Sequence, residues 1–520
     1  MPSLLSPLRY PSVYALLSGA LLVLSFPAPH FSLLAWVALA PLLVVLVQNR
    51  ARWRLFLYGF LAGAVFFAGT CYWIYDVMRI HGHLSPAACV LVLGLFVLVT
   101  APFFGLFSWA VGELARRWQL GALLLAPLVW VAIEWLRTYF PFGGFPWNLL
   151  GYAIAPHIGW VQPAAYVGVY GLSFMIAAVN AFVALFWLAP SRRRAAPLAA
   201  VAVALAIAWF AGRGLPAQPT TATALLVQTN LPQQDVFDPL WVYNNPDEMQ
   251  ALEQLTRDAV RVQPAPPALV IWPEIPVSIY FNHDPVTRAR LISLAQTTRV
   301  YFITGTVDYQ PAGSEHPDVF NSAVLLSPAG ELVAQYDKIE LVPFGEYLPA
   351  IGRLNFFQRM VREVSDFKPG REYDVMPTAH GRLSMLICYE AIFPGLVRQF
   401  VEREGGAEVL VNISNDGWFG RSAAAAQHFN IARLRAVETR RFLLRSTNTG
   451  ISAVIDPYGR VVSRAPDHAR LALPVAFAPR SERSFYARHG DWLPFVCTLA
   501  VLAALGRKFW ATALEEAVRQ

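Results

Sequence analysis

Long apolar runs without charged residues dominate the first 215 positions of the chain. Each run is close to the roughly 20 residues that a helix needs to cross a bilayer, so each predicts a membrane helix. Seven runs lie near 12–28, 31–48, 55–76, 86–112, 119–136, 160–189 and 195–212, and an eighth lies near 491–506. The first run is also typical of a signal peptide, but no small-residue cleavage site follows Pro27, so we interpret it as a retained helix.

The pattern changes between about 214 and 488, where polar residues, turn signals and short β-type runs appear. The strand candidates are 223–228, 268–272, 300–306, 322–326, 383–388, 408–413 and 451–455. Helical stretches at 246–262 and 424–441 separate some of them, which favours an α/β sandwich with helices outside. The predicted organisation is a membrane domain with seven helices over 1–213, an α/β domain over 214–488, and an eighth membrane helix with a tail over 489–520.

Composition and charge narrow the classes of protein. Hydrophobic residues make up 56% of the chain and charged residues 14%, against roughly 25% charged in a soluble protein, which excludes a simple cytosolic enzyme. The net charge of +7 is too small in so apolar a chain to indicate nucleic-acid binding. Arginines concentrate in alternate loops, which predicts that these loops and both termini are cytoplasmic and that 214–488 is extracytoplasmic. The residues concerned are Arg50, Arg52, Arg54, Arg116, Arg117, Arg192, Arg193, Arg194, Arg507 and Lys508.

Cys388 is a candidate nucleophile because it ends an apolar strand where the chain turns. A buried core cysteine is the plainer interpretation. The other three cysteines, Cys71, Cys89 and Cys497, fall in or beside predicted membrane helices, which leaves Cys388 without an obvious disulfide partner in an oxidising compartment. An unpaired thiol in that setting favours a functional role.

A catalytic thiol needs a base or a neighbouring positive charge. Glu274 closes the strand candidate 268–272, where an acidic residue is also compatible with a helix cap or a solvated loop. Lys338 is one of only three lysines in the chain and lies in an apolar stretch, although a lone lysine is usually a solvated surface group. A compact ammonium approaches a developing oxyanion more closely than a guanidinium does.

Together these motifs resemble the Glu, Lys and Cys triad of the nitrilase superfamily of carbon–nitrogen hydrolases. Glu274 stands in Trp-Pro-Glu, Lys338 in Asp-Lys eight residues before Glu346, and Cys388 in Cys-Tyr-Glu. The fusion of such a domain to eight membrane helices resembles the apolipoprotein N-acyltransferase family. Supporting segments are 144–151, 341–349, 412–419 and 447–452.

The resemblance implies a multi-span α-helical membrane domain and an αββα nitrilase-like domain, in which Glu274 is the general base, Lys338 stabilises the oxyanion and Cys388 carries a thioester. It implies a phospholipid donor, typically phosphatidylethanolamine, and a diacylated apolipoprotein acceptor in the bacterial inner membrane, with the catalytic domain on the periplasmic side. No metal or organic cofactor is implied. Further functional or site-shaping positions are Glu346, Tyr389, Glu390, Asn415, Trp418 and Phe237, the last standing where the family commonly has Trp.

Two alternatives remain open. A membrane-tethered amidase would use the same triad with water as the acceptor, but a tether needs only one helix. A transporter or receptor would show broken helices, and the apolar runs give no convincing pair of them. The stretch 344–360 combines apolar residues with arginines, and we interpret it either as an arm that dips into the outer leaflet or as an ordinary core helix.

Overall fold

The computed structural model describes residues 9–232, 240–310, 317–348 and 367–519. The chain divides into two compact units. The first unit comprises 1–79, 85–215 and 489–520, and the second comprises 80–84 and 216–488. Each unit is described by itself.

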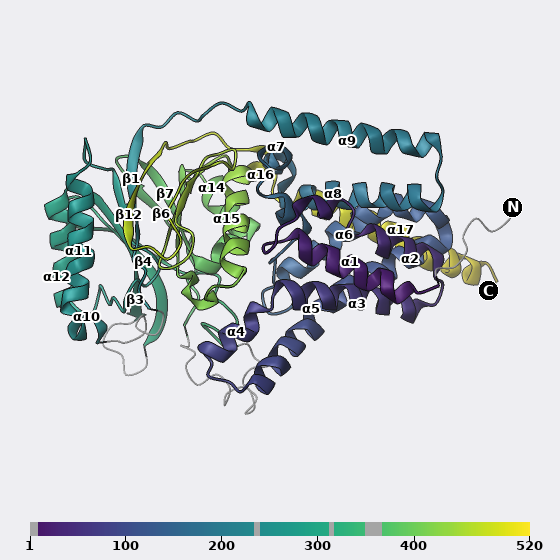
Figure 1. Cartoon of the computed structure of the whole chain (residues 1–520), viewed down its shortest axis with the longest axis horizontal. Coiled ribbons are helices and arrows are strands. Elements are labelled where there is room, and N and C mark those ends of the chain that lie inside the picture. The colour runs from purple at the N-terminus through teal and green to yellow at the C-terminus, as the bar shows by residue number, and fades with distance from the viewer. Residues whose placement is uncertain (1–8, 233–239, 311–316, 349–366, 520) are drawn as a thin grey trace. The chain divides into compact units, whose positions relative to one another are not determined.

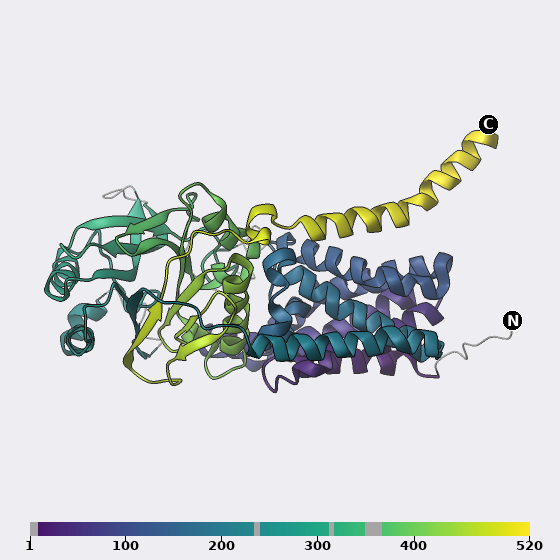
Figure 2. The same ribbon diagram turned by 90° about the horizontal axis from the view of Figure 1, so that it is seen from above.

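The first unit is helical, and in Figure 2 its long helices run roughly parallel to one another. Its helices are α1 (Pro11–Ser25), α2 (Ala40–Gln48), α3 (Arg52–Thr70), α4 (Trp73–Ile80), α5 (Pro86–Trp118), α6 (Ala122–Tyr139), α7 (Ile158–Val161), α8 (Ala164–Leu188), α9 (Arg192–Arg213) and α17 (Trp492–Arg519). Four described segments are long and apolar enough to cross a membrane: Arg52–Thr70, Pro86–Tyr139, Ala164–Leu188 and Arg192–Arg213. Shorter apolar helices cover Pro11–Ser25, Ser32–Gln48 and Trp492–Gly506. Every predicted apolar run is thus helical, while the number of crossings stays a prediction.

Helices α3 and α5 approach each other closely through glycine. A Cβ atom on Gly59 would lie 2.2 Å from the carbonyl oxygen of Phe104 and 2.3 Å from the Ser108 hydroxyl. Such small residues let helix backbones pack tightly where lipid offers no hydrophobic driving force between helices. At one end of the same pair, Arg52 at the start of α3 forms an ion pair of 2.8 Å with Glu113 near the end of α5.

The second unit contains two six-stranded sheets that pack face to face (Figure 1). The first has the order β12-β1-β2-β3-β4-β5 and the second β11-β10-β9-β8-β7-β6. The strands of the first sheet are β1 (Ala222–Gln228), β2 (Leu269–Ile271), β3 (Tyr301–Gln310), β4 (Asp318–Leu326), β5 (Leu332–Asp337) and β12 (Leu471–Phe477). Those of the second are β6 (Val375–Thr378), β7 (Gly381–Ile387), β8 (Val409–Ser414), β9 (Phe442–Thr447), β10 (Ala453–Ile455) and β11 (Val461–Arg464).

Helices cover the outer faces of both sheets. Figure 1 shows α11 (Pro246–Arg261) and α12 (Pro285–Thr298) outside the first sheet, and α14 (Pro394–Glu402) and α15 (Ala424–Thr439) outside the second. This arrangement confirms the predicted αββα sandwich. The inner strands β2, β8 and β9 are buried along their whole length, because both of their faces are covered.

A polar contact joins the two sheets. The hydroxyl of Ser446 on β9 lies 2.9 Å from the carbonyl oxygen of Val227 on β1 and 3.0 Å from that of Ile271 on β2. A buried hydroxyl placed in this way satisfies its own hydrogen-bonding capacity and fixes the register of one sheet against the other.

Candidate active site

Strand ends bring the candidate triad together. Glu274 follows β2, Lys338 directly follows β5, and Cys388 directly follows β7, so two members come from the first sheet and one from the second. All three side chains are buried. Functional groups at strand ends are held by the rigid sheet yet lie where the chain turns away from it.

Lys338 forms the centre of a buried charge cluster. Its Nζ atom is 2.8 Å from Glu346 Oε1 and 3.3 Å from Glu274 Oε1. Burial acts to lower the pKa of Lys338, but the carboxylates of Glu346 and Glu274 outweigh it and hold that pKa above its usual value. The lysine is therefore a positively charged ammonium.

Asn321 on β4 connects the same two carboxylates, and sequence reasoning missed it. Its Nδ2 atom donates to Glu274 Oε1 at 2.9 Å and to Glu346 Oε1 at 2.8 Å. Among the described residues its Oδ1 atom has no hydrogen-bond partner. Turning the amide over would place this oxygen against two carboxylates, so the carboxylates fix its orientation. The available signal was a buried asparagine directly before the apolar half of β4.

The remaining carboxylate oxygens of the pair bind main-chain amides. Glu274 Oε2 accepts a hydrogen bond of 2.9 Å from the Asn415 amide, which lies just beyond β8. Glu346 Oε2 accepts one of 2.8 Å from the Val342 amide. Each carboxylate is therefore held at both oxygens, which fixes the position of Glu274 relative to the strand that carries Lys338.

Cys388 occupies a left-handed backbone conformation, with φ of 49°. Burial raises the pKa of its thiol, and the negative charge of Glu274 raises it further, whereas Lys338 acts in the opposite direction. The resting thiol is consequently protonated, and it must lose its proton to a base before it can attack. Among the carboxylates whose charge acts on the thiol, Glu274 has the largest effect, and Asp416 is already paired with Arg445, so Glu274 is the candidate for that base.

Glu390 braces the segments that carry the lysine and the cysteine. Its Oε1 atom accepts from the Tyr336 hydroxyl at 2.6 Å and from the Ile339 amide at 2.7 Å, and its Oε2 atom accepts from the Ile387 amide at 2.7 Å. Burial raises the pKa of Glu390 to about 7. Its neighbour Tyr389 is also buried and packs edge-to-face against Phe393, with ring centroids 5.2 Å apart.

Other predicted residues lie around this centre or outside the described part of the chain. Asn415 Oδ1 accepts from the Gly417 amide at 3.2 Å and from Asn448 Nδ2 at 3.3 Å. The Trp418 ring packs edge-to-face on His81 at 4.9 Å. Phe237 and the part of the predicted arm from 349 to 360 lie outside the described residues.

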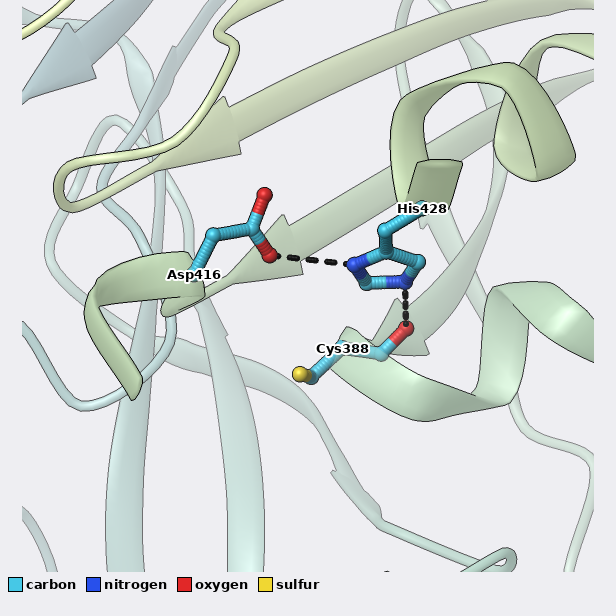
Figure 3. A group of neighbouring side chains, drawn as sticks. All are labelled: Cys388, Asp416 and His428. Atoms are coloured by element: carbon cyan, nitrogen blue, oxygen red, sulfur yellow. Dashed lines mark hydrogen bonds and ion pairs between the residues drawn. The ribbon is translucent and has the colours of Figure 1, made fainter. Parts of the chain in front are cut away.

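Cys388, Asp416 and His428 form a further group whose potential ligand atoms lie within 4.8 Å of one another (Figure 3). His428 on α15 and Arg445 on β9 were not predicted as site residues. Asp416 Oδ2 is 2.7 Å from Arg445 Nη2, and its Oδ1 accepts from the Ser414 hydroxyl at 2.8 Å. Because the guanidinium already neutralises this carboxylate, the donor set fits a hydrogen-bonded network better than a cation site.

The strand-end placement of Glu274, Lys338 and Cys388 on two packed sheets defines a protein of the carbon–nitrogen hydrolase class. The family model for carbon-nitrogen hydrolases matches residues 226–475, and the model for the apolipoprotein N-acyltransferase N-terminal domain matches residues 18–182. The apolipoprotein N-acyltransferase of Geobacter metallireducens is 36% identical, with 94% of each chain covered. That of Bradyrhizobium diazoefficiens is 37% identical over 74% of this chain and 73% of its own. The chain belongs to the apolipoprotein N-acyltransferase family.

Membership of this family makes the protein an acyltransferase and sets the amidase alternative aside. Among solved structures, Nit3 of Saccharomyces cerevisiae, a member of branch 10 of the nitrilase superfamily, is 18% identical, with a TM-score of 0.39. That likeness covers 51% of this chain and 93% of Nit3.

Proposed function

We propose that the protein transfers an acyl chain from a membrane phospholipid, such as phosphatidylethanolamine, to the N-terminal amine of a diacylated lipoprotein. In the first half-reaction, Glu274 takes the proton of the Cys388 thiol and the sulfur attacks the ester carbonyl carbon. A thioester forms as the ester carbon–oxygen bond breaks, and a lysophospholipid leaves with the proton. In the second half-reaction the amine attacks the thioester and releases the thiol.

The observation that carries this proposal is the buried cluster of Lys338 with two carboxylates beside a protonated thiol. In this proposal the ammonium of Lys338, whose charge acts on Cys388, stabilises the tetrahedral oxyanion of either half-reaction. Two carboxylates and one ammonium leave one negative charge in the cluster before the thiol reacts. Glu346 stabilises the lysine as an ammonium, which leaves Glu274 to exchange the proton.

We also propose an inner-membrane location with the second unit on the periplasmic side. The positive residues of the first unit support this orientation. Arg52 at the start of α3 pairs with Glu113 of α5, and Arg50 Nη1 donates to the Ala115 carbonyl at 3.1 Å, so both helices place their arginines at one end. That end would face the cytoplasm.

The test is an acylation experiment on the full-length protein in phosphatidylethanolamine vesicles. Intact-mass measurement should show one acyl adduct, which should be absent in Cys388→Ala and present in the matched control Cys497→Ala. A folded wild-type protein that forms no adduct would refute the proposal. Adding a peptide with an N-terminal S-diacylglyceryl-cysteine should then remove the adduct faster than water does. Release at the same rate with and without the peptide would indicate a hydrolase instead.

A further inference from the structure

The turn that carries the candidate nucleophile needs support from its surroundings. A non-glycine residue is strained in the left-handed region, and Cys388 occupies that region with φ of 49°. Such a conformation persists only where neighbouring groups over-determine it. On the side of β7, Glu390 holds the preceding residue through the Ile387 amide.

His428 holds the other side of the turn. Its Nε2 atom lies 3.1 Å from the carbonyl oxygen of Cys388, and the ring is fully buried in the early part of α15. Figure 3 shows the carbonyl oxygen of Cys388 directed at the imidazole, with the sulfur on the other side of the residue. A carbonyl oxygen can only accept a hydrogen bond, so Nε2 must carry the proton.

The other ring nitrogen faces a charged pair. Nδ1 lies 3.0 Å from Asp416 Oδ1 and 3.1 Å from Arg445 Nη2. In the neutral ring Nδ1 accepts from Arg445, and in the protonated ring it donates to Asp416. Both states leave the Nε2 proton on the Cys388 carbonyl, so the hold on the turn does not depend on the charge of the ring.

We infer that His428 is a positioning residue, which fixes the backbone of Cys388 by donating a hydrogen bond from Nε2 to its carbonyl oxygen. This inference rests on the proposed function and assigns His428 no proton transfer with the thiol. Its two ring nitrogens already face the Cys388 carbonyl and the pair of Asp416 and Arg445. Because a displacement of about 1 Å in a reacting group is enough to slow a reaction about a hundredfold, a lost restraint here should slow acylation without weakening phospholipid binding.

Two amide substitutions distinguish the role of Nε2 from that of Nδ1. The amide nitrogen of glutamine reaches the position of Nε2, whereas that of asparagine reaches only the position of Nδ1. In single-turnover acylation by phosphatidylethanolamine vesicles, His428→Gln should stay within about threefold of the wild-type rate, and His428→Asn should be slowed about tenfold or more. The KM for phospholipid and the shape of the pH–rate profile should be the same in all three proteins. Thermal unfolding of each variant identifies loss of folding.

The possible results distinguish a wrong role for His428 from a wrong proposed function. Equal rates in the two variants, whether fast or slow, would overturn the inference, and so would a changed pH profile in folded His428→Gln. If the asparagine variant does not fold, His428→Met replaces it as an apolar side chain of similar length without a donor, and the same tenfold slowing is expected. A wild-type protein that forms no acyl adduct refutes the proposed function instead. Normal acylation by all variants refutes only the role of His428.

Discussion

Asn321 is the residue whose replacement tests the charge cluster most directly. Its Nδ2 atom donates to one oxygen of Glu274 and one of Glu346, at 2.9 and 2.8 Å. A hydrogen bond to a charged group contributes about 1.5–3 kcal/mol, so the two contribute about 3–6 kcal/mol together. Removing the amide also removes a buried oxygen without a partner in the described structure, which offsets about 1–3 kcal/mol. The difference spans about 0–5 kcal/mol, so we expect Asn321→Ala to lower the free energy of unfolding by about 2.5 kcal/mol, the middle of that range.

Asn321→Asp should lower stability and activity further than Asn321→Ala does, although aspartate has nearly the same shape as asparagine. It places a third carboxylate within about 3 Å of two others, and each contact between like charges at that distance costs about 5 kcal/mol at an effective dielectric constant of about 20. The new carboxyl must take up a proton or leave its place. A protonated aspartic acid can again donate, so the defect should be smaller at about pH 5 than at about pH 8.

The assay combines thermal unfolding by tryptophan fluorescence with the single-turnover rate of acyl-enzyme formation. We expect the order wild type, Asn321→Ala, Asn321→Asp at about pH 8, both in melting temperature and in rate. If Asn321→Asp proved as stable and as active as Asn321→Ala at that pH, the amide would not be separating two ionised carboxylates, and the reasoning would fail.

Three further predictions concern other parts of the molecule. Lys338→Arg keeps the charge but not the compact ammonium, so acyl-enzyme formation should fall about a hundredfold or more, and a single-turnover loss below about threefold would contradict this. Burial raises the pKa of Glu390 to about 7, so its contribution to stability is present at low pH and lost as pH rises towards 7. The melting temperature of the wild type, relative to that of Glu390→Gln, should therefore fall from about pH 5 to about pH 8. A relative melting temperature that rises over this range would contradict the prediction. Gly59→Ala should lower the melting temperature by several degrees because its Cβ would meet Phe104, whereas Gly94→Ala, with open space around it, is the matched control that should not.

The sequence alone predicts those parts of the fold that have a local pattern. Apolar runs identify the helices of the first unit, and the buried run before Glu274 identifies β2 because a strand covered on both faces is continuously apolar. The strand-end position of Cys388 follows in the same way, whereas β5, which precedes Lys338, is half exposed and was not among the predicted strands. The grouping of the triad does not follow, because it depends on how two sheets pack.

The residues that support the site, Asn321 and His428, could not be predicted either, because their contacts also depend on how separate elements pack. Asn321 meets Glu274 only when β4 and β3 pair beside β2, and His428 meets Cys388 only when α15 packs on the turn after β7. Neither contact leaves a spacing in the sequence. Glu390 was expected to shape the site, but its partners Tyr336, on β5, and Ile339, just after β5, lie more than fifty residues away in the sequence.

The contact of Ser446 with Val227 and Ile271 spans the boundary that also divides the triad. Glu274 and Lys338 belong to one sheet and Cys388 to the other, so the proposed mechanism requires the two layers to stay aligned to within about 1 Å. Sliding of one layer on the other would leave every strand intact while separating the Cys388 sulfur from Glu274, its proposed base. The rate of turnover therefore reports this alignment more sensitively than circular dichroism, which measures secondary structure. On heating, acyl transfer should stop while the secondary structure is still present.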